Sequence, residues 1–519
     1  MSQISWSLNH NFFLFVFVFH SSRYRESAEI SARWLWQVEQ LEGTVVFPHM
    51  LEPRAENGQR RVLKVRDDLI LNLENANAYS DYFIVRSHID ENTIQEDHFR
   101  AEDYDKYFFL DHANMASVAV TERDGLQVEG ILGEKLRIRP LPERERSDEG
   151  HVAHLLFEVD VPETRHDDYV IPEEYYAAAQ EEHATVSERK DIPKRIYPEL
   201  FLVCDSAFVR GFRKGLESII FYFGVQINAV NMRYISVKNP NVRVRLVGFE
   251  LTTKDTEPFV RLSTLSKMQI LGNPSLSAFG HHVKKHRKKY GMFDMVYLVT
   301  GLDIIEQHGS VVQDFAGFAY VGAICTDGRV AIGEDIPKVW KHIRTMAHEV
   351  GHLLGCPHDG YYAPSALRHN TGSSRCPWSD GFIMSYIQNS IREFRFSSCC
   401  NEMIRYVVRL PGRECMSRQD VRITYNKQIY LPGFYLDSDK QCQKYMGYLL
   451  KETRSLKDAL AKHALLSCKI LCFVPKALYG FETHMDMYAL DGTVCKSGNV
   501  CYNGLCKPKP NIRPDTLEK

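Results

Sequence analysis

The fold of this chain is decided by residues 348–358, which read HEVGHLLGCPH. On a helix, His348 and His352 lie one turn apart on the same face, and Glu349 lies about 100° around the axis from His348. Gly355 has no Cβ, so the chain can leave the helix in a left-handed conformation and bring His358 back toward the other histidines. Three imidazoles around one point, with a fourth position open, are the ligand set of a catalytic zinc.

Hydrophobic periodicity predicts the helix itself. Apolar residues recur at three- and four-residue spacing at Val339, Trp340, Ile343, Ala347, Val350 and Leu354. An ordinary amphipathic helix with satisfied histidines is the alternative to a metal site. The periodicity explains the helix and its buried face, but it does not explain why His, Glu, His and His occupy these positions.

A second motif follows at residues 376–386, which read CPWSDGFIMSY. Alone, Met384 would be a core methionine, but after three histidines it resembles the Met-turn of the metzincin metalloproteases. Asp359, directly after the third histidine, is similar to the reprolysin (adamalysin) branch, which includes snake-venom metalloproteases and ADAM proteases. The Ile-Met-Ser-Tyr turn is closer to the astacin and serralysin branches. The combination looks most like secreted reprolysin-type metalloproteases of arthropods, particularly those of tick saliva.

This resemblance implies an α+β fold, with a twisted mixed sheet and helices in a metzincin zinc-protease domain. It implies that His348, His352 and His358 bind one Zn²⁺ ion, with Met384 beneath it. Glu349 would be the general base for the water that attacks a peptide bond, and Tyr386 would stabilise the transition state or bind zinc.

Residues Gly317–Cys325 are rich in β-formers and small side chains and predict a strand. Their position before the zinc helix resembles the metzincin edge strand, to which a peptide substrate adds as one more strand. An interior strand is the alternative interpretation.

The same resemblance suggests further ligands and links. Glu199, Asp294 and Asn401 fall where some reprolysins bind Ca²⁺, although surface placement explains the first two equally well. By family analogy, Cys356 would pair with Cys376, and Cys325 would pair with Cys399 or Cys400. The pairing cannot be deduced from the sequence itself.

The cysteines divide the chain sharply. None of the 13 precedes Cys204, and seven lie between Cys415 and Cys506. A dense cluster of this kind is typical of a small secreted module held by disulfides. Its end, with DGTVC at 491–495 and CYNGLC at 501–506, resembles the cysteine-rich region of ADAM proteases and their thrombospondin-motif relatives. Thirteen is odd, and we expect Cys204 to be a buried free thiol.

Four regions are expected. Residues 1–25 form a signal segment around the apolar run Phe12–Phe19, although a buried or interfacial segment is the alternative. Residues 26–195 form a mostly β propeptide with a strongly charged end, and the dibasic pairs Arg189-Lys190 and Lys194-Arg195 would be cut by a processing protease. Residues 196–410 form the protease domain, and residues 411–519 form a disintegrin-like, cysteine-rich module.

The propeptide departs from the family in one respect. Reprolysin propeptides commonly silence zinc with a cysteine thiolate, and here no cysteine precedes Cys204. We expect latency to come from a carboxylate or histidine of the prosegment near residues 166–168, or from steric cover alone.

The sequence thus predicts a secreted zinc metalloendopeptidase that acts on extracellular proteins. A net charge of −2 gives no argument for nucleic acid, and no apolar run is long enough for a membrane span. The alternative is a catalytically spent binding or adhesion protein that acts through its cysteine-rich module. Degenerate scaffolds usually lose the glutamate or a histidine, and here all four residues survive.

Overall fold

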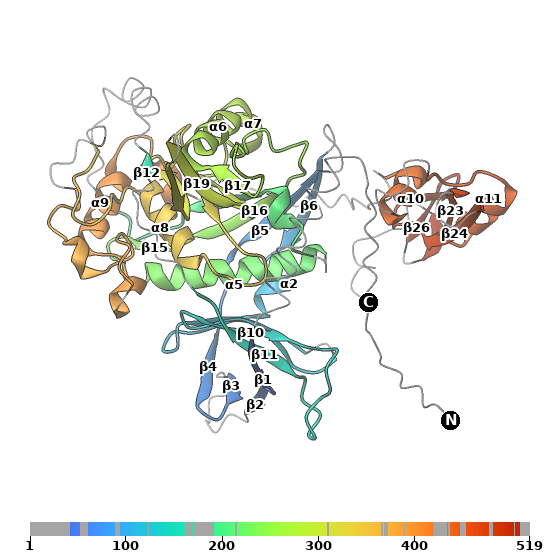
Figure 1. Cartoon of the computed structure of the whole chain (residues 1–519), viewed down its shortest axis with the longest axis horizontal. Helices are drawn as coiled ribbons and strands as arrows, with labels where there is room; N and C mark the ends of the chain where they lie inside the picture. Colours follow the sequence, from blue (N-terminus) through green and yellow to red (C-terminus); the bar gives the residue numbers. More distant parts are fainter. Residues whose placement is uncertain are drawn as a thin grey trace, which may run out of the picture. The chain divides into compact units, whose positions relative to one another are not determined.

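The structure of the chain is a computed structural model (Figure 1). It describes residues 42–51, 61–88, 94–122, 124–160, 169–170, 191–212, 215–308, 311–364, 367, 372–388, 390–418, 433, 436–446, 453–476, 481–502 and 504–508. The expected signal segment, residues 166–168 and Arg189-Lys190 lie outside these ranges. The chain divides into two compact units, Met1–Phe83 with Arg100–Arg422, and Ile84–Phe99 with Ile423–Lys519.

The first unit begins with a nine-stranded sheet, called here the N-terminal sheet. Its strands, in spatial order, are β1 (Gly43–Val46), β11 (His154–Glu158), β10 (Leu136–Pro140), β9 (Gln127–Leu132), β8 (Ala116–Thr121), β7 (Phe108–Asp111), β4 (Leu69–Asn75), β3 (Arg61–Arg66) and β2 (His49–Leu51). The short helix α2 (Glu102–Asp105) precedes β7. Alternation explains the strands: Leu63 and Val65 of β3 and Leu71 and Leu73 of β4 are buried, and their neighbours are not. The mostly β character predicted for this part of the chain is confirmed.

A second, mixed sheet, called here the central sheet, forms the centre of the first unit. Its strands run in the order β12 (Tyr169–Val170), β21 (Gly317–Tyr320), β22 (Val330–Glu334), β18 (Met295–Thr300), β14 (Glu199–Cys204), β16 (Arg245–Leu251) and β5 (Tyr79–His88). Strands β16, β14, β18 and β22 are parallel, whereas β21 is antiparallel to β22. All residues of β14 and β18 are buried, as expected for parallel strands covered on both faces.

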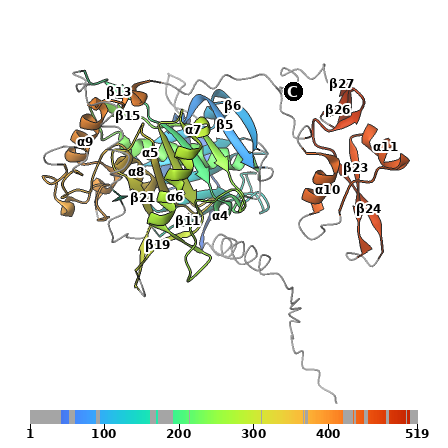
Figure 2. The same ribbon diagram turned by 90° about the horizontal axis from the view of Figure 1, so that it is seen from above.

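Helices and small sheets surround this central sheet. They are β13 (Arg195–Ile196) with β15 (Asn241–Val242), β17 (Gln269–Leu271) with β19 (Asp303–His308) and β20 (Val311–Phe315), and the helices α4 (Ser206–Val209), α5 (Leu216–Tyr234), α6 (Gly272–Lys285), α7 (Arg287–Tyr290), α8 (Ile343–Leu353), η2 (Trp378–Asp380), η3 (Ile391–Phe394), α9 (Ser398–Arg409) and η4 (Glu414–Ser417). In both views α9 lies beside the zinc-motif helix α8 (Figures 1 and 2). The described chain is therefore an α+β protein, as predicted.

Two predicted elements differ from the structure in length. The periodicity predicted a helix from Val339, but α8 begins at Ile343. Lys338 and Trp340 have positive φ angles of 66° and 49°, a left-handed conformation that a helix cannot contain. The strand predicted over 317–325 ends at Tyr320, because the chain turns there to pack against the end of α8. In that turn the Gly322 N–H donates to the His352 carbonyl at 2.7 Å.

The second unit contains the disulfide-rich C-terminal region. Its elements are β6 (Ile94–Arg100), α10 (Ser438–Met446), α11 (Ala459–Leu466), β23 (Lys469–Val474), β24 (Thr483–Tyr488), β25 (Val494–Lys496), β26 (Asn499–Tyr502) and β27 (Leu505–Pro508). Three disulfides hold this region, Cys442–Cys472, Cys468–Cys501 and Cys495–Cys506, and their sulfur atoms lie in a small buried cluster. Disulfides replace a large core in such small modules. Among the described residues, no helix combines the length and apolar character needed to cross a membrane.

Candidate metal centre

The three histidines of the opening motif meet at one buried point. His348 and His352 project from one face of α8, and their candidate ligand atoms and that of His358 all lie within 4.8 Å of one another. The Nε2 atoms of His348 and His358 are 3.1 Å apart. Gly355 has a φ of +111°, so it makes the predicted left-handed turn that returns the chain to His358.

Hydrogen bonds orient two of these rings. His348 Nδ1 lies 2.7 Å from the Ile383 carbonyl oxygen, and His352 Nδ1 lies 2.7 Å from the Cys356 carbonyl oxygen. A carbonyl only accepts, so each Nδ1 carries the hydrogen and each Nε2 keeps its lone pair toward the cluster. Imidazoles oriented in this way by backbone carbonyls are the donor set that zinc takes in catalytic sites. The three residues therefore fit the metal.

Glu349 lies against the first residue of β21. Its side chain is fully buried, on the helix position next to His348. A Cβ added to Gly317 would stand 2.6 Å from Glu349 Oε1 and 2.8 Å from its Cδ. Because Gly317 has no Cβ, the Glu349 carboxylate fits beside β21 at the edge of the central sheet. The sequence reasoning assigned Gly317 only to a strand, and its small size was the one signal available.

The predicted Met-turn lies beneath the helix. Met384 is buried, and a Cβ on Gly351 would stand 3.0 Å from its Sδ atom, which places the thioether between the turns that carry His348 and His352. Tyr386 Oη is 3.3 Å from His358 Nε2, the atom that faces the other histidines. Met384 therefore packs against the helix between the two histidines and Tyr386 lies beside His358, and the roles of both residues stay predictions.

Arg344 holds the Met-turn from the helix. It lies one turn before His348 and donates from Nη2 to the carbonyl oxygens of Phe382 at 3.3 Å, Ile383 at 3.2 Å and Ser385. The Ile383 carbonyl also accepts from His348, so one guanidinium ties the turn to the ring orientation of a ligand. Nothing in the sequence pattern indicated this contact.

Asp359 anchors the third histidine. Its N–H donates to the Met384 carbonyl at 2.9 Å, and its Oδ1 accepts from Ser397 Oγ at 2.6 Å. Burial raises the pKa of the Asp359 carboxyl to about 6, while the Ser397 hydrogen bond lowers it. Ser397 also caps α9, so the segment after His358 is fastened to both the Met-turn and α9.

The disulfide pairs predicted by analogy are wrong. Cys356 pairs with Cys400, Cys376 with Cys399, and Cys325 with Cys415. Gly355 packs directly on Val407 of α9, which brings Cys356 next to that helix rather than next to Cys376. Cys399 and Cys400 are successive residues of α9 and point about 100° apart, so each reaches a different partner. Cys204 is the one unpaired cysteine and is buried, as predicted.

Two of the three residues suggested for calcium are in direct contact. Glu199 and Asp294 are both buried, and the Glu199 N–H donates to Asp294 Oδ2 at 2.9 Å. Asn401 lies on α9 instead, where its Oδ1 accepts from the Lys238 N–H at 3.2 Å. Calcium binding at the three residues stays a prediction.

Comparisons with known proteins agree with this geometry. Residues 221–359 match the model of the reprolysin-like metallopeptidases of family M12B. A protein of Bombyx mori named "A disintegrin and metalloproteinase with thrombospondin motifs like" is 27% identical over 431 residues, 79% of this chain and 59% of that protein. Venom metalloproteinase antarease TserMP_A of Tityus serrulatus is 28% identical over 321 residues, 60% of this chain and 79% of that protein. Venom metalloproteinase BumaMPs1 of Olivierus martensii is 26% identical over 373 residues, 70% of this chain and 89% of that protein.

The buried cluster of His348, His352 and His358 lies within the segment that matches the reprolysin-like metallopeptidases, and this match supports a zinc metalloendopeptidase. In residues 221–359 the chain is similar to the reprolysin-like family, and the relatives that it matches include proteins named as arthropod venom metalloproteinases. The chain spans about three fifths of the Bombyx mori relative. A particular likeness to tick proteins stays a prediction.

Proposed function

We propose that this chain is a secreted zinc-dependent metalloendopeptidase that hydrolyses internal peptide bonds of extracellular proteins, with Glu349 as the general base. One observation carries the proposal. Three imidazoles, two of them oriented by backbone carbonyls, lie on and after helix α8, and the buried Glu349 carboxylate of the same helix lies beside Gly317, the first residue of strand β21. A metal ligand set and a base beside a peptide-binding strand are the parts that peptide hydrolysis needs.

His348, His352 and His358 would hold the zinc ion. When bound, zinc supplies a Lewis acid and lowers the pKa of a water to about 7. The buried Glu349 carboxylate accepts the proton of the attacking water and delivers it to the leaving amine. Tyr386 would donate to the oxygen that becomes negative during attack, and the 3.3 Å between its Oη and His358 Nε2 supports this role.

The substrate would bind along β21. This strand lies next to β22 near the edge of the central sheet. Among the described residues its other neighbour is β12, which comes from the N-terminal part of the chain. Main-chain pairing along such a strand gives affinity without strong choice of side chains. Extension of the substrate along β21 carries its backbone past Gly317 and therefore past Glu349.

The pairing of β12 supports latency by steric cover. Tyr169 and Val170 pair with Ala319 and Tyr320 of β21 in the parallel direction, so the prosegment occupies the edge that a substrate would use. A thiolate is not needed for this arrangement. Cutting at Arg189-Lys190 or at Lys194-Arg195 would break the covalent link between the prosegment and the protease chain. The side chains of Lys194 and Arg195 are exposed.

Secretion is proposed from the cysteines. Six disulfides link 12 of the 13 cysteines, and disulfides persist in oxidising compartments. The names of the scorpion relatives, which are venom metalloproteinases, support the same proposal. The alternative remains a spent binding protein that acts through residues 411–519.

Cleavage of casein or gelatin by the zinc-loaded chain tests the proposal. Activity is expected to stop with a zinc chelator and with Glu349→Ala, which should keep its zinc. Glu402→Ala is the matched control, because Glu402 lies on the outer side of α9 in an ion pair with Arg375. The chain should be tested folded, loaded with zinc and cut after the prosegment. If it then cleaves neither substrate, the result would favour the alternative, a spent binding protein.

A further inference from the structure

Helix α5 is buried on every side. Of its 19 residues, 15 are buried, and the burial is continuous from Ile219 to Val230, more than three full turns. One face of a surface helix normally stays in contact with water, whereas a helix covered all round belongs to a core. Helix α8 and the central sheet cover only part of α5.

The N-terminal sheet covers the rest. Strands β7, β8 and β9 lie against α5, which runs between this sheet and the catalytic part in Figure 1. The ring of Phe108 rests directly on the backbone at Gly224, where a Cβ would stand 2.1 Å from its Cζ atom. Ser117 Oγ donates to the Val225 carbonyl at 2.8 Å, and both residues are buried.

Aromatic packing adds to this contact. The rings of Tyr104, Tyr107 and Phe108 surround Phe221 of α5 at centroid distances of 6.3, 5.5 and 5.8 Å, all edge to face. Edge-to-face pairs contribute about 0.5 to 1.5 kcal/mol each beyond the burial of their apolar area. Loss of the N-terminal sheet would expose Phe221 and the bare backbone at Gly224 together.

A buried arginine makes a second attachment at the start of the zinc helix. Arg137 of β10 is 1% exposed and donates from Nε to the Val339 carbonyl at 3.0 Å and from Nη2 to the Trp340 carbonyl at 2.8 Å. These carbonyls belong to the left-handed turn that precedes α8. Burial lowers the pKa of the Arg137 guanidinium to about 10, which leaves it charged at neutral pH. Separation would remove the donor from two inward-facing carbonyls.

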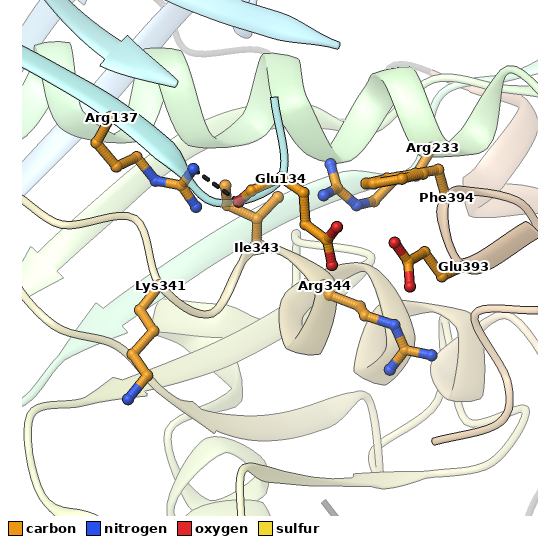
Figure 3. A pocket seen from close by; sticks show the side chains of 8 residues that line it. All are labelled: Glu134, Arg137, Arg233, Lys341, Ile343, Arg344, Glu393 and Phe394. Atoms are coloured by element: carbon orange, nitrogen blue, oxygen red, sulfur yellow. Dashed lines mark hydrogen bonds between the residues drawn. The ribbon is translucent and has the colours of Figure 1, made fainter. Parts of the chain in front are cut away.

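A third attachment lies in the pocket of Figure 3. Glu134, from the turn between β9 and β10, reaches toward Glu393 of η3, and burial together with the nearby Glu134 carboxyl raises the pKa of Glu393 to about 7. Arg344 and Arg233 flank this pair and offset its charge. Arg344 is also the residue that holds the Met-turn. The turn between β9 and β10 therefore lines the same pocket as the residue that holds the Met-turn.

We propose that the N-terminal sheet is a lasting subunit of this protease, which stays bound to α5 and to the start of the zinc helix after the chain is cut between residues 171 and 195. A prosegment that only covers the active site would leave on cutting. Here the covered surface is far larger than the two-residue contact at β21, and it belongs to the core of the first unit.

A chain with a built-in cleavage site tests this proposal. Residues 181–187 are replaced by the recognition sequence of a site-specific protease in a full-length Glu349→Ala chain, so that neither self-cleavage nor catalysis affects the result. After complete cutting, gel filtration is expected to show both fragments in one peak at the position of the uncut chain. Two separate peaks would overturn the proposal, whether or not the catalytic fragment stays folded.

A pair of arginine variants tests the interface itself. Arg137→Met should raise the dissociation constant of the cut fragments at least tenfold, measured by dilution and gel filtration. Arg144→Met is the control, because Arg144 follows the same strand but is exposed. Equal dissociation constants for the two variants would contradict the assigned interface. If Arg137→Met does not fold, Ser117→Ala, which removes only the bond to Val225, should still raise the dissociation constant.

Discussion

Substituting Gly317 by alanine should disable Glu349 without removing zinc. The new Cβ would stand 2.6 Å from Glu349 Oε1, whereas ordinary contacts of a Cβ begin at 3.4 Å. The carboxylate or the strand must therefore shift by about 0.8 Å, and a misplacement of about 1 Å can cost about 100-fold in rate. We expect kcat to fall about 30- to 100-fold, which corresponds to about 2 to 3 kcal/mol of activation free energy.

The assay is steady-state cleavage of a quenched fluorescent peptide, with zinc content and melting temperature measured on the same samples. Gly333→Ala is the matched control, because Gly333 is the residue opposite Gly317 on β22. A Cβ there would meet Tyr297 Oη, so the control should lose stability but keep its kcat at temperatures where it is folded. A normal kcat for zinc-loaded Gly317→Ala, or an equal loss in Gly333→Ala, would refute the reasoning.

Three further predictions follow from the same contacts. Cys400→Ser opens the Cys356 disulfide, and chemical unfolding should show a loss of about 2 to 4 kcal/mol, with weaker zinc retention on dialysis than in Cys204→Ser. Tyr386→Phe should lower kcat about tenfold at unchanged zinc content, and an unchanged kcat would remove Tyr386 from the mechanism. Burial lowers the pKa of His154 to about 4, and its Nε2 accepts from the Val128 N–H, so the folded state holds neutral His154. The contribution of neutral His154 to the free energy of unfolding is complete above about pH 6.5 and is lost as the pH falls toward 4. Urea unfolding should show a loss of up to about 3 kcal/mol over this range, and His154→Gln should show much less pH dependence.

The centre of the site could be predicted because its geometry is local. His348 and His352 share a face through the helical repeat, and the left-handed turn at Gly355 needs only a residue without a Cβ. The same holds for β3 and β4, where the alternation of apolar residues corresponds to the pleat of a strand. These features depend on neighbours within a few residues, so the sequence carries them directly.

The tertiary structure decided which distant segments meet. The pairing of Cys356 with Cys400 depends on how α9 packs against Gly355, and no spacing in the chain records that packing. The start of α8 at Ile343 depends in part on carbonyls held by Arg137, a residue of the N-terminal sheet more than 200 positions earlier. The sequence by itself determined a helix with two histidines on one face and the turn that follows it. The tertiary structure decided the contacts that orient the histidines, the space beside Gly317 for the Glu349 carboxylate, and the burial of α5. These features depend on surfaces that form only when distant parts of the chain pack together.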